Sequence, residues 1–161
     1  MAIEIERKFL VTGDGWRGAA TSSSALRQGY LSTNAKATVR IRIIDDARAV
    51  LTLKGPTRGI SRAEFEYDVP LEEGRALLEM ARPEVVEKRR YEVPFGGLTW
   101  EVDVFEGAHA GLIMAEVELT DAAQDIALPD WAGREVSHDD RYANASLSRN
   151  PGVPAIIPDR A

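Results

Sequence analysis

The amino-acid sequence predicts an α+β protein in which antiparallel strands, each with one charged and one apolar face, pack with a few helices. Charged side chains recur at every second position in several segments, which is the side-chain period of a β-strand. Turn-forming residues separate these segments at short intervals. Residues 71–81, between Pro70 and Pro83, have instead the apolar spacing of an amphipathic helix. These three observations favour a sheet-rich fold with helices on its apolar side.

The first predicted strand covers residues 1–11. Glu4, Glu6 and Lys8 share one face of it, and apolar side chains occupy the other. Charges two residues apart on a strand lie about 7 Å from one another, so both carboxylates can bind one cation. A half-buried strand with its polar face in water alternates in the same way. The interpretation of this strand therefore depends on whether the pattern recurs.

The pattern does recur along the chain. Glu72 and Glu73 fall in the first turn of the predicted helix, where the helix dipole favours anions. No linker or low-complexity segment divides the chain, so we expect one domain over residues 1–161. In order, we expect a helical turn at 16–20, a loop at 22–24, a strand from 28, a hairpin of 37–44 and 49–54 around Asp45-Asp46, a loop at 55–59, a strand at 61–69, the helix at 71–81, strands at 86–93 and 98–105 around a turn at 94–97, a strand at 115–119, a helix at about 139–149 and an irregular tail from 151.

Composition limits the class of function. At 161 residues and 44% hydrophobic content, the chain can bury one sizeable core. Its net charge of −6 argues against a general nucleic-acid binder. Without cysteine, a metal would be held by oxygen or by one of only two histidines, and oxygen ligation suits Mg, Mn or Ca. No segment approaches the roughly 20 apolar residues that span a bilayer, so we expect a cytoplasmic protein without a membrane partner.

Two arrangements of the charged strand faces are open. An open sheet would expose them to water, whereas a closed barrel would enclose them around a lumen that holds water, counterions or a polyanion. Alternation by itself does not choose between the two. The charged sets are Glu4/Glu6/Lys8, Arg40/Arg42, Arg62/Glu64/Glu66, Lys88/Arg90/Glu92, Glu101/Asp103 and Glu116/Glu118, with Lys54 standing alone.

The residue types indicate a chemistry. Arginine offers fork-shaped donors that fit phosphate oxygens, and the basic sets carry more positive charge than one monophosphate needs. Glutamates are hard oxygen ligands that suit Mg²⁺ or Mn²⁺, which keep waters and substrate phosphates as further ligands. A chain of phosphates between the two clusters is the simplest ligand. The basic set is Arg40, Arg42, Lys54, Lys88 and Arg90, and the acidic set is Glu4, Glu6, Glu116 and Glu118.

These motifs resemble the CYTH superfamily, also called triphosphate tunnel metalloenzymes, and most of all its short bacterial members that hydrolyse inorganic triphosphate. The resemblance begins with the ExExK motif at residues 4–8 and extends over most of the chain. It implies a closed or nearly closed eight-stranded antiparallel β-barrel with a charged interior, helices outside, and a final helix that plugs one mouth or leaves it open. The matching motifs are Gln28-Gly29-Tyr30-Leu31, Val39-Arg40-Ile41-Arg42, Leu53-Lys54-Gly55, Arg62-x-Glu64-Phe65-Glu66-Tyr67, Lys88-x-Arg90, Glu101-x-Asp103, Ala115-Glu116-Val117-Glu118-Leu119 and Asp139-Asp140-Arg141-Tyr142-Ala143-Asn144.

The resemblance also implies roles for single residues. Glu4, Glu6, Glu116 and Glu118 would hold Mg²⁺ or Mn²⁺, and Asp103 is a further candidate ligand. The catalytic candidates are Lys8, Glu6 and Tyr30, of which Tyr30 would tune the lysine. Arg62 is a candidate phosphate ligand that could instead brace its neighbours. The phosphate-binding candidates are Lys8, Arg40, Arg42, Lys54, Arg62, Lys88 and Arg90.

Three functions are therefore compared. The first is metal-dependent hydrolysis of inorganic triphosphate, a small polyanion. The second keeps the fold but changes the chemistry, to a class IV-type adenylate cyclase or a hydrolase of nucleoside or thiamine triphosphate. The third is a polyphosphate-binding module without catalysis. The sequence allows a homodimer and does not decide the oligomeric state.

Overall fold

The computed structural model describes residues 3–34 and 36–155, and within them nine strands form one sheet. Residues 1–2 of the predicted first strand and residues 156–161 of the predicted tail lie outside the described residues. The strands are β1 (Ile3–Val11), β2 (Ser22–Thr33), β3 (Thr38–Ile44), β4 (Arg48–Lys54), β5 (Ser61–Val69), β6 (Val85–Phe95), β7 (Leu98–Phe105), β8 (Ile113–Glu118) and β9 (Ala132–Glu135).

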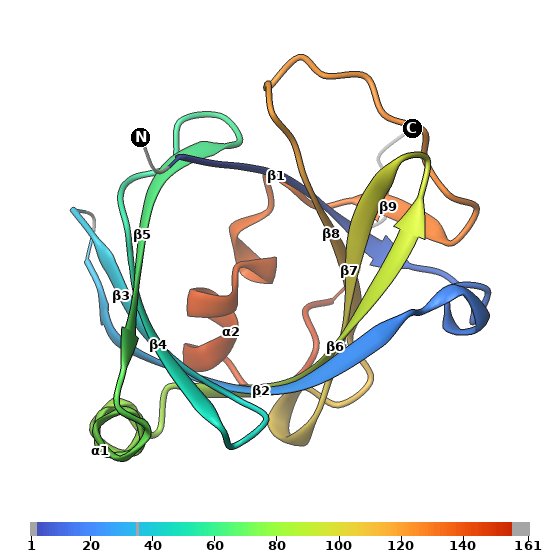
Figure 1. The fold of residues 1–161 in the computed structure, drawn as a ribbon. Coiled ribbons are helices and arrows are strands. Elements are labelled where there is room, and N and C mark those ends of the chain that lie inside the picture. The colour runs from blue at the N-terminus through green and yellow to red at the C-terminus, as the bar shows by residue number, and fades with distance from the viewer. Residues whose placement is uncertain (1–2, 35, 156–161) are drawn as a thin grey trace.

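The sheet closes into a barrel (Figure 1). The strand order is β5-β4-β3-β2-β6-β7-β8-β1-β9, and β1 also pairs with β5. Eight antiparallel strands therefore form a ring, and β9 is added outside it on β1. The expected closed eight-stranded barrel is confirmed, which excludes the open sheet.

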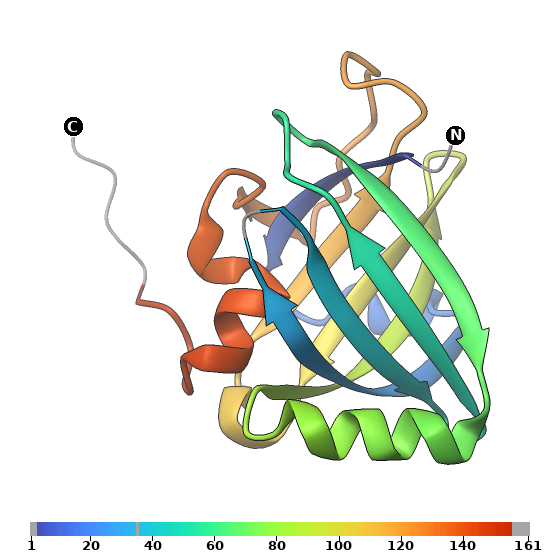
Figure 2. The ribbon, with the colours of Figure 1, turned by 90° about the vertical axis from the view of Figure 1, so that its left-hand side faces the viewer.

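In the part of the chain that the structure describes, two helices and three short 3₁₀ turns complete the fold. Figure 2 shows α1 (Leu71–Ala81) along the outside of the barrel and α2 (Asn144–Arg149) at one mouth. In the view along the barrel, α2 lies across the opening (Figure 1). The turns are η1 (Arg17–Ala19), η2 (Gly107–His109) and η3 (Asp140–Tyr142). Among the residues that the structure describes, no helix is long and apolar enough to cross a membrane.

The helix α1 covers the apolar outer face of β2, β3 and β4. The helix approaches the sheet closely at Gly74, which has no side chain. A Cβ added there would come within 2.3 Å of the Ala49 Cβ. Leu78 is 3% exposed and packs with Ile41 and Ile43. Burying such a side chain contributes about 2 kcal/mol. The predicted helix over 71–81 is confirmed at both ends.

A second core covers the opposite wall of the barrel from outside. Phe9, Trp16, Trp100 and Trp131 are the large members of this core, and the Trp100 and Trp131 rings meet edge-on at 5.4 Å. Because Trp100 alternates with the charged residues of β7, its side chain points away from the lumen. The apolar faces that the sequence shows are thus the outer faces of the barrel.

A third apolar cluster fills the α2 mouth from within. Each of its strand residues lies two positions from a charged residue of the same strand and therefore on the same face. These residues are Val86, Phe105 and Met114. They pack against Tyr142 and Leu147, which are 2% and 1% exposed. The lumen is therefore apolar where α2 enters it and charged beyond that point.

Two predicted loops differ from the structure. The loop expected at 22–24 is the start of β2, because Ser22 to Ser24 pair with Glu92 to Arg90 of β6. The turn expected at 94–97 is shorter, since Gly96 and Gly97 alone have positive φ and make it. Pro94 belongs to β6 but lies past Glu92, the last residue of β6 that pairs with β2. The N–H that proline lacks is therefore not needed for pairing with β2.

The end of the chain also differs from the prediction. The helix expected over 139–149 divides into η3 and α2, because Ala143 has extended dihedral angles, φ −65° and ψ 134°. The Asp139 carboxylate accepts a hydrogen bond from the Arg141 backbone N–H and begins the first turn. This break redirects the chain so that Asn144 enters the barrel mouth. The strand β9 was not predicted.

Candidate active site

A charged cavity of about 310 Å³ lies inside the barrel. This volume is at the lower end of the range for small-molecule sites. With one exception, Asp103, every residue that the sequence predicted as a catalytic, phosphate-binding or metal-binding residue lines it. The barrel brings these residues together because the lumen-facing positions of neighbouring strands lie opposite one another.

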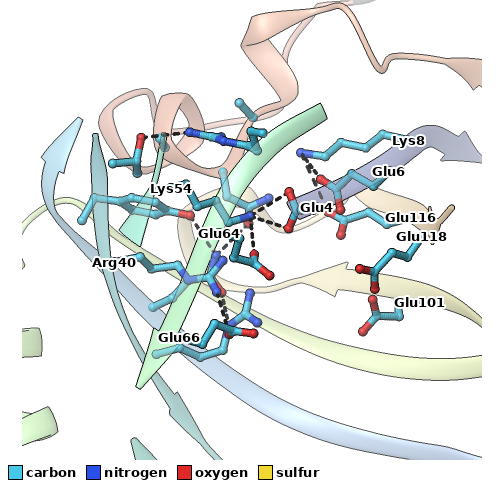
Figure 3. Close-up of a pocket in the computed structure, with 18 of the residues that line it drawn as sticks. Glu4, Glu6, Lys8, Arg40, Lys54, Glu64, Glu66, Glu101, Glu116 and Glu118 are labelled. Carbon is cyan, nitrogen blue, oxygen red and sulfur yellow. Dashed lines mark hydrogen bonds and ion pairs between the residues drawn. The ribbon is translucent and has the colours of Figure 1, made fainter. Parts of the chain in front are cut away.

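Carboxylates predominate on one side of the cavity, with Lys8 among them, and the other side carries several cations together with Glu64 and Glu66. Figure 3 shows Glu6, Glu116 and Glu118 on one side, and Arg40 and Lys54 on the other. Strand register produces the acidic side, because Glu6 of β1 lies opposite Glu118 of β8, and Lys8 lies opposite Glu116. The arrangement can bind a ligand that carries both negative charge and cations.

Asp103 lies behind the cavity wall and is fully buried. Its carboxylate accepts two hydrogen bonds from Arg90, at 2.8 and 2.9 Å, and lies 2.6 Å from the Lys88 Nζ. Burial alone would raise the pKa of Asp103, but Arg90 and Lys88 hold it below its usual value. With both oxygens so engaged, Asp103 orients two cations toward the lumen. This arrangement favours a positioning role over the predicted metal ligation.

The basic residues differ in how well their charge is compensated. Lys88 and Arg90 share Asp103, and Lys54 lies 2.9 Å from a Glu4 carboxylate oxygen. Arg42 has no carboxylate partner among the described residues, and its Nε donates to the Gln28 Oε1 at 2.8 Å. Burial, together with the neighbouring arginines, lowers the pKa of Arg42 to about 9. Among the described residues, no carboxylate therefore lies in ion-pair contact with the Arg42 guanidinium.

Arg40 and Arg62 also retain unused hydrogen-bonding capacity. The Arg40 Nε is buried and has no hydrogen-bond partner, and the nearest carboxylate oxygen, from Glu66, lies 3.9 Å from its Nη2. Arg62 donates to the Gly55 carbonyl oxygen and to the Thr38 hydroxyl, and makes no ion pair with the described residues. Unsatisfied buried donors are costly, so these guanidinium groups form a site suited to anionic oxygens.

On the acidic side, Glu6 is a poorly compensated carboxylate, because it shares the Lys8 cation with Glu116. Burial and the adjacent Glu116 raise its pKa to about 8. The Lys8 Nζ lies 3.6 Å from the Glu6 carboxylate and 3.9 Å from that of Glu116. Burial would lower the pKa of Lys8, but Glu6 and Glu116 outweigh it and raise this pKa. Lys8 therefore stays protonated at neutral pH, while Glu6 favours its proton or a cation.

A divalent cation fits the chemistry of this side. Among the described residues, no three histidine or carboxylate side chains are arranged as a complete metal site. Mg²⁺, however, commonly takes only one or two carboxylates and completes its shell with waters and phosphate oxygens. The poorly compensated charge of Glu6 is the observation that supports a cation beside it.

Two neutral side chains that the sequence did not assign to the site, Gln28 and Asn144, also line the cavity. Gln28 is fully buried, and its Nε2 donates to the Tyr30 hydroxyl at 3.0 Å and to the Asn144 Oδ1 at 3.1 Å. Tyr30 itself is 5% exposed and lines the cavity. Gln28 lies two positions before Tyr30 and so shares its strand face, which is a usable signal. Nothing in the sequence places Asn144 near either residue.

Comparison with known proteins agrees with this geometry. A family model for the CYTH domain matches residues 2–148. An inorganic triphosphatase from Acetivibrio thermocellus is 45% identical over 152 residues, which cover 94% of this chain and 96% of the relative. One from Nitrosomonas europaea is 37% identical over 151 residues, with coverages of 90% and 96%. The crystal structure of the inorganic triphosphatase NE1496 matches with a TM-score of 0.65 and 35% identity, over 92% of this chain and 95% of that one. The chain therefore belongs to the CYTH domain family.

Proposed function

We propose that this protein, acting as one domain over residues 1–161, hydrolyses inorganic triphosphate to diphosphate and phosphate with the help of a divalent cation. The observation that carries the proposal is that Arg42 and Arg62 line the lumen and make no ion pair with a carboxylate among the described residues. The similarity to two inorganic triphosphatases over nearly the whole chain supports the same activity.

Substrate binding falls to the basic side. Arg40, Arg42 and Arg62 would bind phosphate oxygens through their unused donors, whereas Lys88 and Arg90 reach the lumen in orientations that Asp103 holds. Phosphoryl transfer needs mainly correct positioning and stabilisation of charge on the transferred group. A rigid barrel wall suits this task, because each cation is held by paired strands.

Lys8 and Tyr30 are proposed to act closest to the chemical step. Because its pKa is raised, Lys8 would stabilise negative charge as a cation and would not serve as a base. The Tyr30 hydroxyl accepts a hydrogen bond from Gln28, which leaves its own proton free for a phosphate oxygen. Glu4, Glu6, Glu116 and Glu118 would hold Mg²⁺ or Mn²⁺. Such an ion would supply positive charge to the phosphate oxygens and orient a water for in-line attack.

The cavity favours an inorganic substrate over a nucleotide. Tyr30 is the only aromatic side chain among the described residues that line it, and Gln28 already holds its hydroxyl. Every other lining side chain that could recognise a ligand is charged or small and polar. A base or thiazole ring would therefore find no stacking platform.

A phosphate-release assay tests the proposal. Triphosphate, ATP and thiamine triphosphate are compared at equal concentration with Mg²⁺ or Mn²⁺, and cyclic AMP is measured in the ATP reaction. We expect triphosphate to have the highest kcat/KM. Dominant cyclic AMP formation, a preference for ATP or thiamine triphosphate, or tight triphosphate binding without turnover would each refute it.

A further inference from the structure

Asn144 is the first residue of α2 and projects into the charged part of the lumen. It is 9% exposed and lines the cavity, whereas Leu147 of the same helix packs in the apolar mouth. Its Oδ1 accepts hydrogen bonds from two strands, at 3.0 Å from the Lys88 Nζ and 3.1 Å from the Gln28 Nε2. The helix therefore contributes a polar group to a site that is otherwise built by the barrel.

The orientation of the Asn144 amide follows from its neighbours. A lysine ammonium group has only donors, so the Asn144 atom that faces Lys88 must be the oxygen. Gln28 is oriented by the same reasoning, because Arg42 can only donate and therefore faces the Gln28 oxygen. The Gln28 Nε2 is then the atom that faces Asn144. Lys88 and Arg42 thus independently indicate that the Asn144 oxygen faces the barrel wall.

This assignment leaves the Asn144 Nδ2 as the free end of the amide. Within residues 3–34 and 36–155, the Nδ2 donates no hydrogen bond to another side chain or to the backbone. It has two N–H donors, and it is not one of the fully buried atoms without a partner, so a ligand in the cavity can reach it. The two side chains that contact this amide, Lys88 and Gln28, both donate to its oxygen. An anionic oxygen of a ligand in the cavity could therefore accept from the Nδ2.

We propose that Asn144 is a substrate-binding residue, whose Nδ2 donates to an oxygen of the bound polyphosphate while its Oδ1 holds Lys88 and Gln28. The inference rests on the proposed function for the identity of the anion. The amide dipole has its negative end toward the cation of the wall and its positive end toward the substrate. The helix α2 therefore does more than close the mouth, because it completes the phosphate site.

Two substitutions separate substrate binding from a tethering role. Asn144→Asp preserves shape and an oxygen that accepts from Lys88 and Gln28, but it places a second carboxylate oxygen where the Nδ2 was. Asn144→Ala removes both ends of the amide. If the Nδ2 contacts substrate, the aspartate variant binds polyphosphate more weakly than the alanine variant, because like charges meet. If Asn144 only tethers α2, the alanine variant has a lower Tm but keeps the affinity of the wild type for polyphosphate.

The measurement is the affinity for inorganic diphosphate by calorimetry, together with kcat and KM for triphosphate and the Tm of each variant. We expect about a 10-fold loss of diphosphate affinity for Asn144→Ala and about 100-fold for Asn144→Asp. Most of the kinetic change should be in KM, and the Tm of Asn144→Asp should be no lower than that of Asn144→Ala. Ser146→Asp adds the same charge on α2 outside the cavity lining, and its affinity should stay within about twofold.

The outcomes distinguish this inference from the proposed function. Affinity of Asn144→Asp equal to or above that of Asn144→Ala overturns the inference even in an active enzyme. If Asn144→Asp does not fold, unchanged diphosphate affinity in Asn144→Ala overturns it. A wild-type protein that binds diphosphate without hydrolysing triphosphate refutes the function, while the order of affinities still decides the role of Asn144.

Discussion

Replacing Arg42 by alanine should lower activity without lowering stability. The guanidinium of Arg42 donates to Gln28 and has no carboxylate partner among the described residues. A hydrogen bond to a charged group contributes about 1.5–3 kcal/mol, and each 1.4 kcal/mol is tenfold in an equilibrium constant. We therefore expect kcat/KM for triphosphate to fall by about 10- to 150-fold, mainly through a higher KM.

The stability of the substrate-free protein should change in the other direction. The pKa of Arg42 falls from 12.5 to about 9, which at 1.36 kcal/mol per unit is at most about 5 kcal/mol of unfavourable charging. Water in the lumen screens much of this cost, and loss of the bond to Gln28 removes about 1 kcal/mol. We expect the free energy of unfolding to be unchanged or about 1 kcal/mol higher.

Arg90→Ala is the matched control, because Arg90 lines the same cavity but is paired. Its removal leaves the buried Asp103 with Lys88 alone, which should cost about 3–5 kcal/mol. Urea denaturation and steady-state phosphate release, measured on both variants, test the contrast. A loss of more than about 2 kcal/mol in Arg42→Ala with kcat/KM unchanged would show that Arg42 is structural and refute the reasoning.

Further predictions concern the metal, the pH dependence and the packing of α1. EDTA should abolish triphosphate hydrolysis and Mg²⁺ or Mn²⁺ should restore it, so activity retained in EDTA would contradict the metal dependence. Glu6→Gln should lose metal-dependent turnover but keep the fold by circular dichroism; full turnover would remove the metal assignment. Burial and Glu116 raise the pKa of Glu6 from 4.5 to about 8 in the folded protein. Protonation of Glu6 therefore stabilises the metal-free folded state, and this contribution of about 2–5 kcal/mol is fully present below pH 4.5. It is lost as the pH rises to 8. Urea midpoints across that range should fall less steeply in Glu6→Gln than in the wild type. Gly74→Ala should destabilise by about 1–3 kcal/mol because its Cβ would meet Ala49 at 2.3 Å, whereas Gly18→Ala, with no neighbour within 4 Å, should leave the thermal midpoint nearly unchanged.

The sequence predicted the lumen-facing residues well because a strand encodes its two faces directly. Glu4 and Glu6, or Arg40 and Arg42, share a face whatever the partner strand is. The pairing of strands, by contrast, depends on chain closure, and it is pairing that brings Glu6 opposite Glu118. Asp103 follows the same alternation, yet Arg90 and Lys88 cover its carboxylate and keep it out of the cavity.

Residues 139–149 mark the limit of such prediction. Their local pattern is helical, but the break at Ala143 depends on how the chain must turn to enter the barrel mouth. Gln28 and Asn144 are 116 residues apart, and no local pattern connects them. Their contact, and hence the orientation of the Asn144 amide, exists only because α2 enters a closed barrel.

Alternation along each strand was enough to predict which residues share the charged face and which form the apolar cover, because side-chain direction is a local property of the backbone. The class of ligand came from the residue types on the charged face and from the family resemblance. Closure of the ring, the apolar filling of the α2 mouth and the pairing of individual charges are long-range properties. They decide which cations have no carboxylate partner among the described residues, as with Arg42, and which are held by one, as with Lys88. Inside the lumen these differences affect binding, because a buried charge without an opposite charge is destabilising and is stabilised by an anionic ligand.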